Sequence, residues 1–201
     1  VTVTVLASSA PVMSSATSTT ICSGATLAFP FVATGATGYL WIASDNTNTT
    51  GESYVNTTNS ATLNNAITLI AAFPQVVTYS VTAYNASCPA GTNPIQSFSV
   101  NVNTSPSGSA PSNISVCVGG TAVFSTIASG GGTYTYQWQQ NSVNIGGATS
   151  SSYSLPGVTA LMNGFTYRCI ISNGCGTNYT TTAAALTVNT LPTISLTGVN
   201  P

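Results

Sequence analysis

The chain has 201 residues, and only three of them carry a charged side chain: Asp45, Glu52 and Arg168. It contains no histidine. Acid–base catalysis needs a positioned proton carrier, metal sites need several carboxylate, histidine or thiolate ligands, and nucleic-acid binding needs rows of lysine and arginine. The composition therefore predicts a protein that is not an enzyme, holds no metal or cofactor and does not bind nucleic acid.

The apolar residues are spread along the chain in short runs. The longest run, near 66–73, is far below the ~18 residues that a helix needs to cross a bilayer, so no membrane span is expected. Hydrophobic residues still make up 43% of the chain, which is enough to form a core. The five cysteines favour disulfides and therefore an extracellular or cell-surface location.

Strand-like alternation of apolar and polar residues begins at 1–5 and recurs along the chain. A first set of strands is predicted at 26–33, 39–43, 61–70, 75–84 and 96–103. A second set is predicted at 114–117, 122–128, 135–140, 143–145, 152–155, 166–172 and 181–188. The pair Asn173-Gly174 predicts a two-residue hairpin turn after one of these strands.

The two sets of strands are copies of one repeat. The segment Ile21-Cys22-Ser23-Gly24 matches Val116-Cys117-Val118-Gly119, and a phenylalanine follows seven residues after each cysteine. A Tyr-x-Trp motif follows in both copies, at 39–41 and 136–138. Repeats of about 85–95 residues with roughly seven short strands predict an all-β protein with two tandem β-sandwich domains.

The repeat places the two domains at 7–103 and 104–189 and leaves an incomplete strand at each end. Residues 1–6 are interpreted as the last strand of a preceding repeat, or as a strand that is donated to a neighbouring subunit. Residues 190–201 are interpreted as the start of a following repeat or as a linker. The chain is thus expected to be a window on a longer tandem array, or a subunit that assembles by strand donation.

The second copy carries the more informative sequence. Its segments WQQNSVNIGGATSSSYSL (138–155) and MNGFTYRCIISNGCG (162–176) resemble the immunoglobulin-like and PKD-like tandem repeats of large secreted surface proteins, the adhesins of Bacteroidota. The resemblance implies immunoglobulin-like sandwiches that serve as spacers or adhesive modules on a cell surface. It implies no particular ligand, because this fold hosts many roles.

The cysteines depart from the pattern of antibody domains, because the second copy lacks their second-strand cysteine. Comparison of the copies matches Cys22 with Cys117 and Cys88 with Cys175. The bonds Cys22–Cys88 and Cys117–Cys175 are therefore predicted, with Cys169 as a free buried thiol. The competing pairing, Cys117–Cys169, leaves Cys175 available for a bond to another chain.

Other candidate sites follow from residue type. Asp45 and Glu52 are expected in a solvated loop and Arg168 on the surface. Tyr134 and Tyr136 are expected at the rim of the core, or else in a patch that binds glycan or protein. Six Asn-x-Ser/Thr sequons mark candidate glycosylation sites: Asn48, Asn56, Asn85, Asn103, Asn113 and Asn178. The predicted core residues are Phe29, Trp41, Leu69, Tyr79, Val81, Phe124, Ile127, Trp138, Leu155, Tyr167 and Cys169.

These features together predict a non-enzymatic extracellular structural protein. Its tandem sandwiches are expected to form part of a surface filament or adhesin stalk that self-associates, with β-strand complementation as one route of assembly. The alternative is an adhesive module that binds carbohydrate or protein through the loops at a sandwich end. Almost no charge protects the strand edges, which favours pairing between strands of different subunits. Because there is little charge for salt to screen, we expect assembly that depends little on salt.

Overall fold

The computed structural model describes residues 9–52, 60–190 and 192. The chain divides into two compact units. Unit 1 runs to Ser105 and includes Gly130–Gly132, and unit 2 comprises Pro106–Ser129 and the chain from Thr133 onward. The terminal strand predicted at 1–6 lies outside the described residues, as does most of 190–201.

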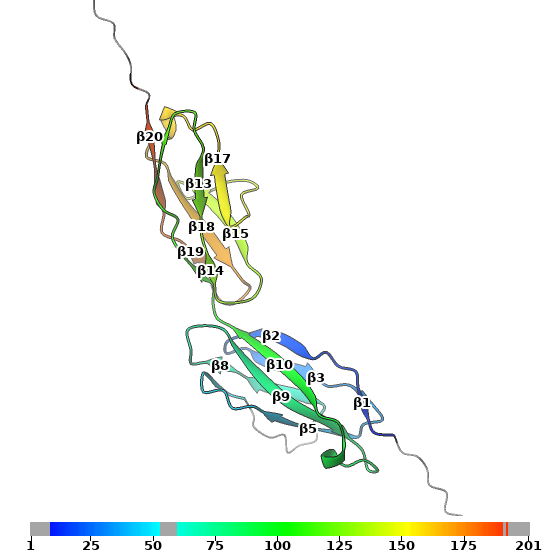
Figure 1. Ribbon diagram of the computed structural model, residues 1–201. Helices are drawn as coiled ribbons and strands as arrows, with labels where there is room; N and C mark the ends of the chain where they lie inside the picture. Colours follow the sequence, from blue (N-terminus) through cyan, green and yellow to red (C-terminus); the bar gives the residue numbers. More distant parts are fainter. Residues whose placement is uncertain (1–8, 53–59, 191, 193–201) are drawn as a thin grey trace, which may run out of the picture. The chain divides into compact units, whose positions relative to one another are not determined.

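One layer of unit 1 is a four-stranded sheet in the order β2-β10-β9-β5 (Figure 1). Its strands are β2 (Ser18–Cys22), β5 (Gly38–Ala43), β9 (Gln75–Tyr84) and β10 (Gln96–Asn103). The strand β2 pairs with β10 in parallel, whereas the other neighbours are antiparallel. In β9, the alternate residues Val77, Tyr79 and Val81 point into the sandwich and are fully buried, as the period-2 pattern predicts.

The other layer of unit 1 is built from short antiparallel pairs. The strand β3 (Thr26–Pro30) pairs with β7 (Thr62–Ala66), β1 (Val12–Met13) with β4 (Ala33–Thr34), and β6 (Thr49–Thr50) with β8 (Thr68–Leu69). A single turn of 3₁₀ helix, η1 (Ala90–Thr92), lies between β9 and β10. The core between the layers is aromatic, with Phe31 lying 5.5 Å from Trp41 and 5.4 Å from Phe98 between ring centroids.

Unit 2 repeats this architecture. Its larger sheet has the order β12-β20-β18-β15-β16, with β19 also paired to β18. These strands are β12 (Ile114–Cys117), β15 (Thr135–Gln140), β16 (Val143–Asn144), β18 (Thr166–Ser172), β19 (Tyr179–Thr180) and β20 (Ala184–Asn189). The opposite layer pairs β13 (Ala122–Ser125) with β17 (Ser152–Leu155) and β11 (Ser107–Gly108) with β14 (Ala128–Ser129). A second 3₁₀ turn, η2 (Ala160–Met162), precedes β18.

The core of unit 2 is centred on Trp138, which is fully buried. Its indole Nε1–H donates a hydrogen bond of 2.9 Å to the carbonyl of Ser150. Phe124 stacks on Tyr167 with 4.3 Å between ring centroids. Both tryptophans are core residues, because the equivalent Trp41 of unit 1 is also buried.

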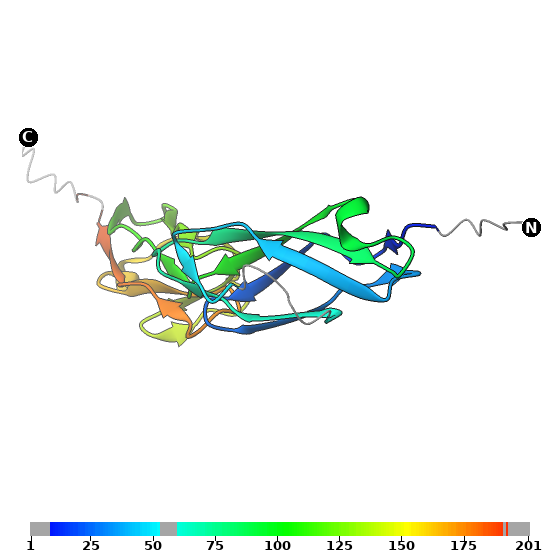
Figure 2. The same ribbon diagram turned by 90° about the horizontal axis from the view of Figure 1, so that it is seen from below.

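The chain enters each sandwich at one end and leaves it at the other. In unit 1, β1 and η1 lie at the end where the chain enters (Figures 1 and 2), and β10 ends at Asn103 on the opposite side. In unit 2, the chain enters through β11 and leaves through β20, which ends at Asn189. We call these ends the entry pole and the exit pole of each unit. Because β9 spans ten residues, the poles of unit 1 are about 30 Å apart.

Two local expectations from the sequence are wrong. Ile127 is 78% exposed, because the alternation that buries Phe124 places the third residue after it on the outer side. The residues Asn173-Gly174 do not form a two-residue hairpin, since β18 and β19 are joined by a longer loop. The two-residue turn lies instead between β15 and β16, at Asn141 and Ser142, whose φ angles are +48° and +70°.

Candidate functional site

Each unit carries one cysteine at its exit pole, held in the same turn. Cys22 ends β2 opposite Asn103, and Cys117 ends β12 opposite Asn189. The three amides that follow the cysteine are hydrogen-bonded identically in both units. In unit 1 these bonds are Ser23 N to Asn103 O (2.8 Å), Gly24 N to Ile67 O (2.8 Å) and Ala25 N to Cys22 O (3.0 Å). In unit 2 they are Val118 N to Asn189 O (3.0 Å), Gly119 N to Val158 O (2.7 Å) and Gly120 N to Cys117 O (3.0 Å).

Each unit also carries one cysteine at its entry pole. Cys88 follows β9, and Cys175 follows β18. An asparagine side chain accepts a hydrogen bond from the cysteine amide in both loops, at 2.8 Å for Asn85 and 3.0 Å for Asn173. The sequence comparison therefore matches equivalent positions of the two copies. The two cysteines that were predicted to bond within each unit, however, lie at opposite poles of that unit.

The predicted disulfides Cys22–Cys88 and Cys117–Cys175 are wrong, because the two cysteines of each pair lie at opposite poles. The Cα atoms of a disulfide lie within about 7 Å of each other, whereas the whole length of the sandwich separates Cys22 from Cys88, and Cys117 from Cys175. Cys22 takes part in a disulfide, and so does Cys175. Cys117 is an exposed free thiol, which also excludes the competing bond between Cys117 and Cys169.

Cys169 carries a buried thiol in the centre of β18, opposite Trp138. Burial raises the pKa of this thiol to about 11, and a hydrogen bond with the backbone of Gln137 opposes the shift. Because the thiolate is the reactive species, Cys169 is inert at neutral pH and acts as a small apolar side chain. Its equivalent in unit 1 is Val81, which lies opposite Trp41.

The charged side chains do not form a catalytic arrangement in the described part of the chain. Asp45 is exposed, whereas Glu52 is only 7% exposed and accepts a hydrogen bond of 2.8 Å from the hydroxyl of Thr49, so the solvated loop expected for Glu52 is wrong. The half-buried Arg168 on β18 donates from Nε to Gln139 Oε1 at 2.7 Å. Among residues 9–52, 60–190 and 192, no three His, Cys, Asp or Glu side chains gather to hold a metal ion.

A buried polar pair crosses the layers of unit 1 near Glu52. The amide of Asn65 on β7 donates a hydrogen bond of 2.7 Å to the hydroxyl of Tyr79 on β9. Burial raises the pKa of Tyr79 to about 12, and the nearby Glu52 carboxyl adds to the shift, while the bond with Asn65 opposes it. This pair holds the two layers in register and offers no reactive group at neutral pH.

The two tyrosines beside the glycine loop belong to the rim of the core in unit 2. Tyr134 and Tyr136 are half-buried, pack against the core and lie 6.5 Å apart between ring centroids. They do not form an exposed aromatic platform of the kind that stacks on sugars.

The sequons differ in accessibility. Asn48, Asn113 and Asn178 are exposed. Asn85 is half-buried: its side-chain oxygen accepts hydrogen bonds from the amides of Ser87 and Cys88, and its side-chain nitrogen donates to the carbonyl of Gly35. Asn103 is 6% exposed beside the exit turn, so its side chain is covered in the folded protein and its glycosylation stays a prediction. Asn56 lies outside the described residues.

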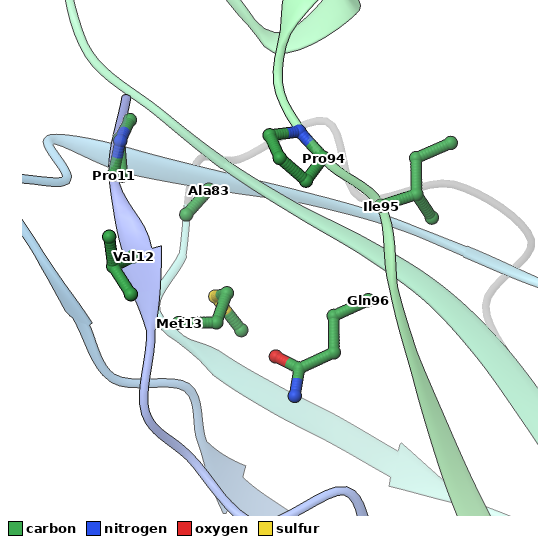
Figure 3. A pocket seen from close by; sticks show the side chains of 7 residues that line it. All are labelled: Pro11, Val12, Met13, Ala83, Pro94, Ile95 and Gln96. Carbon is green, nitrogen blue, oxygen red and sulfur yellow. The ribbon is translucent and has the colours of Figure 1, made fainter. Parts of the chain in front are cut away.

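An exposed apolar surface lies at the entry pole of unit 1, around Ile95. Ile95 is 70% exposed and separates two shallow hollows, of about 190 and 230 Å³. The first lies between β1 and the start of β10, where Met13 and Gln96 point toward each other (Figure 3). The amide oxygen of Gln96 is buried there and accepts no hydrogen bond from the described residues. The second hollow lies over β5 and β9, beside the exposed Ile42.

This Ile95 surface was not predicted from the sequence. Its residues come from strands and from the loop before β10, and they look like ordinary core positions when read along the chain. The available signal was the pair Asn93-Pro94, which ends the loop and makes Ile95 a loop residue instead of a strand residue.

Comparisons with known proteins agree with this architecture. Residues 19–107 match the family model of a PKD-like domain. No curated protein matches the chain. Similar solved structures include Dpr2 Ig1-Ig2 in complex with DIP-Theta Ig1-Ig3, with 13% identity, a TM-score of 0.54, and coverage of 90% of this chain and 67% of that one. Dpr11 IG1 bound to DIP-gamma IG+IG2 has 12% identity, a TM-score of 0.52, and coverage of 89% and 98%.

A further similar structure is an E-to-A mutated variant of titin domains I67-I69. It has 14% identity and a TM-score of 0.48, and the match covers 90% of this chain and 66% of the titin fragment. The chain therefore spans just under two thirds of that fragment. At these identities the likeness concerns the fold, and it defines the class: the protein consists of tandem immunoglobulin-like β-sandwiches, the first of which is similar to the PKD-like family. None of the helical turns in the described residues is long enough to cross a membrane.

Proposed function

We propose that this protein is a non-enzymatic, extracellular structural module of a surface filament or adhesin stalk, in which sandwiches in series bear load along the chain. The observation that carries the proposal is the pairing of the strands next to the entry and exit segments. In both units a strand near the start of the sandwich, β2 or β12, pairs in parallel with the last strand, β10 or β20.

Parallel pairing determines how the sandwich responds to tension. When the chain is pulled from both ends, β2 and β10 are drawn in opposite directions along their common axis. All hydrogen bonds between them are then loaded together, in shear, instead of opening one by one. The disulfide at Cys22 and the scarcity of ionisable groups suit a durable module outside the cell.

The alternation of hydrogen bonds along β2 supplies a sharp test. Ser23 N donates to Asn103 O at 2.8 Å, and Ser99 N donates to Thr17 O at 2.9 Å, so the odd-numbered residues of β2 carry the bonds to β10. The amide of Thr19 therefore points to β10, whereas the amide of Thr20 points away from it.

Force spectroscopy on the chain held at both ends, under conditions that reduce its disulfides, tests this function. Thr19→Pro removes a bond that carries the load and should lower the unfolding force of unit 1, while the matched control Thr20→Pro should leave it nearly unchanged. Unit 2 should unfold at the same force in both variants. Equal forces for the wild type and Thr19→Pro would rule out the shear mechanism.

Strand complementation is the route of assembly that we propose for this module. In the described residues, β5 is an edge strand of unit 1 with no charged side chain, so an added strand meets no electrostatic barrier. The alternating segment 1–5 is the candidate donor. Deletion of 1–6 should abolish oligomers in sedimentation velocity experiments, and unchanged oligomers would exclude this donor.

The Ile95 surface favours a second candidate function, adhesion to a partner protein. The surface is apolar and uncharged, and the buried Gln96 amide oxygen is placed to accept a hydrogen bond from a bound backbone amide. Ile95→Ser should abolish cell or matrix adhesion without changing the unfolding free energy by more than about 0.5 kcal/mol, because Ile95 is exposed. The exposed Val143→Ser in unit 2 is the matched control.

A further inference from the structure

Arg168 is the only lysine or arginine of the chain, and it lies on the outer face of the larger sheet of unit 2. Its neighbours along β18, Tyr167 and Cys169, are buried in the core, so strand alternation places Arg168 on the other side of the sheet. Both carboxylate side chains, Asp45 and Glu52, belong to unit 1. Unit 2 therefore presents a cation for which its own sequence supplies no counter-ion.

The guanidinium of Arg168 is held by a row of side chains that crosses three strands. Gln139 on β15 lies opposite Arg168 on β18 and opposite Asn144 on β16. Arg168 donates from Nε to Gln139 Oε1 at 2.7 Å, and Gln139 donates from Nε2 to Asn144 Oδ1 at 2.8 Å. Gln139 is only 8% exposed, so the middle of the row is covered and the groups at its two ends are fixed in orientation.

The row leaves hydrogen-bond donors at both ends. Among the described residues, the two Nη atoms of Arg168 and the Nδ2 atom of Asn144 find no acceptor, and none of these three atoms is enclosed. Two residues along β15 on the same face, Gln137 donates from Nε2 to the carbonyls of Trp138 and Ile145, at 2.8 and 2.9 Å. These two bonds leave its Oε1 accessible as an acceptor. The face thus offers a cationic donor, an amide donor and an amide acceptor.

These groups select the chemistry of a ligand. A guanidinium binds carboxylate or phosphate through paired N–H donors, and a single cation balances a singly charged carboxylate better than a phosphate with nearly two charges. A polyanion such as nucleic acid needs a row of cations. Peptides bind by adding to a strand edge or by filling an apolar or aromatic groove, and the row provides neither. Amides of fixed orientation suit the hydroxyl groups of a sugar, which donate and accept.

We propose that the outer face of unit 2 around Arg168 binds a carboxylated sugar, a uronic acid or sialic acid residue of a glycan. The Nη atoms of Arg168 hold the carboxylate, while Asn144 Nδ2 and Gln137 Oε1 bond to sugar hydroxyl groups. Arg168 and Asn144 are two strands apart, about 9–10 Å between backbones, so a sugar contacts both where a carboxylate alone does not. The site lies on a sheet face of one unit and goes beyond the proposed stalk function.

Titration of the isotope-labelled chain, followed by NMR, tests the site. The probes are methyl β-D-glucuronide and the methyl α-glycoside of N-acetylneuraminic acid. Methyl β-D-glucoside, which has the ring of the glucuronide without the carboxylate, is the matched control ligand. We expect a sugar acid to give saturable shifts of the Arg168 Nε–H signal and of the side-chain amides of Gln139 and Asn144. The glucoside should bind at least about tenfold more weakly, and the tighter sugar acid identifies the source of the carboxylate.

Variants separate the charge from the amides. Arg168→Gln removes the charge but keeps a donor for Gln139, and it should lower the affinity at least about tenfold. Asn144→Ala removes an exposed amide and should lower the affinity about fivefold, which tests the site even if Arg168→Gln fails to fold. Val123→Ser, on the outer side of the opposite layer, is the matched control and should bind like the wild type. Circular dichroism checks the fold of each variant.

Four results would overturn the proposal. They are no shift with either sugar acid, equal affinity for glucuronide and glucoside, unchanged affinity in both folded variants of the row, and acetate or an acetylated aspartate peptide that binds as tightly as the sugar acids. The last result would show that the face recognises any carboxylate, including that of a protein. The force measurement on Thr19→Pro concerns unit 1, so failure of the stalk function is recognised separately.

Discussion

At the scale of single residues, Tyr79 and Cys169 are the groups whose protonation the fold affects most. Both are fully buried, and burial raises the pKa of Tyr79 from 10.0 to about 12 and that of Cys169 from 9.0 to about 11. Below about pH 8 both groups are protonated in the folded and the unfolded chain, so they cause no pH dependence there. Above that pH the unfolded chain loses these protons first.

We therefore expect stability to fall as pH rises through 9 to 11. Because the unfolded state binds fewer protons in this range, each group lowers the free energy of unfolding by up to about 1.4 kcal/mol per pH unit. In a Trp41→Phe background, Trp138 fluorescence during urea unfolding reports unit 2, after exposed thiols have been alkylated. Cys169→Val removes the thiol and should flatten the dependence of the unfolding free energy on pH between pH 9 and 10. Valine should fit at this position, since unit 1 carries Val81 there. An equally steep fall in this variant would contradict the assignment.

At the scale of elements, the turn between β15 and β16 places two residues that are not glycine in the left-handed region of backbone conformation. Ser142 has a φ of +70° and Asn141 one of +48°. The side chain of Asn141 compensates, because its Oδ1 accepts a hydrogen bond of 2.9 Å from the amide of Thr166. Ser142 makes no such bond in the described residues.

Ser142→Gly should accordingly raise the free energy of unfolding of unit 2 by about 0.5–1 kcal/mol, because glycine adopts this φ without strain. Asn141→Gly is the matched control, and it should gain nothing or lose stability, since it also removes the bond to Thr166. Thermal unfolding followed by circular dichroism measures both. A destabilised Ser142→Gly variant would show that the turn is not strained.

The strands show which parts of the fold can be predicted from the sequence. The segments 75–84, 96–103, 114–117, 135–140, 152–155 and 166–172 were predicted with the bounds that the structure has, because alternation records which side faces the core. β2 was missed, since Ser18–Cys22 is mostly threonine and serine and lies at a sheet edge. The cysteine pairing failed for a different reason: matching the repeats identifies equivalent residues, whereas pairing depends on the pole at which each residue lies.

At the scale of the whole molecule, the near absence of charge determines the response to salt. With two carboxylates, one guanidinium and no histidine, almost nothing is left for salt to screen. Sedimentation profiles should therefore be the same between about 0.05 and 0.5 M NaCl and between about pH 5 and 8. Dissociation of oligomers by salt in this range would show that ion pairs hold them together, contrary to assembly by strand pairing.

The single arginine has a further consequence. Trypsin cleaves after lysine and arginine, and this chain offers it one bond, between Arg168 and Cys169, within a strand paired on both sides. The strand must unfold from the sheet before a protease can cleave this bond. The folded protein should thus survive trypsin-like proteases in its surroundings, and any cleavage into two fragments would signal that unit 2 had opened.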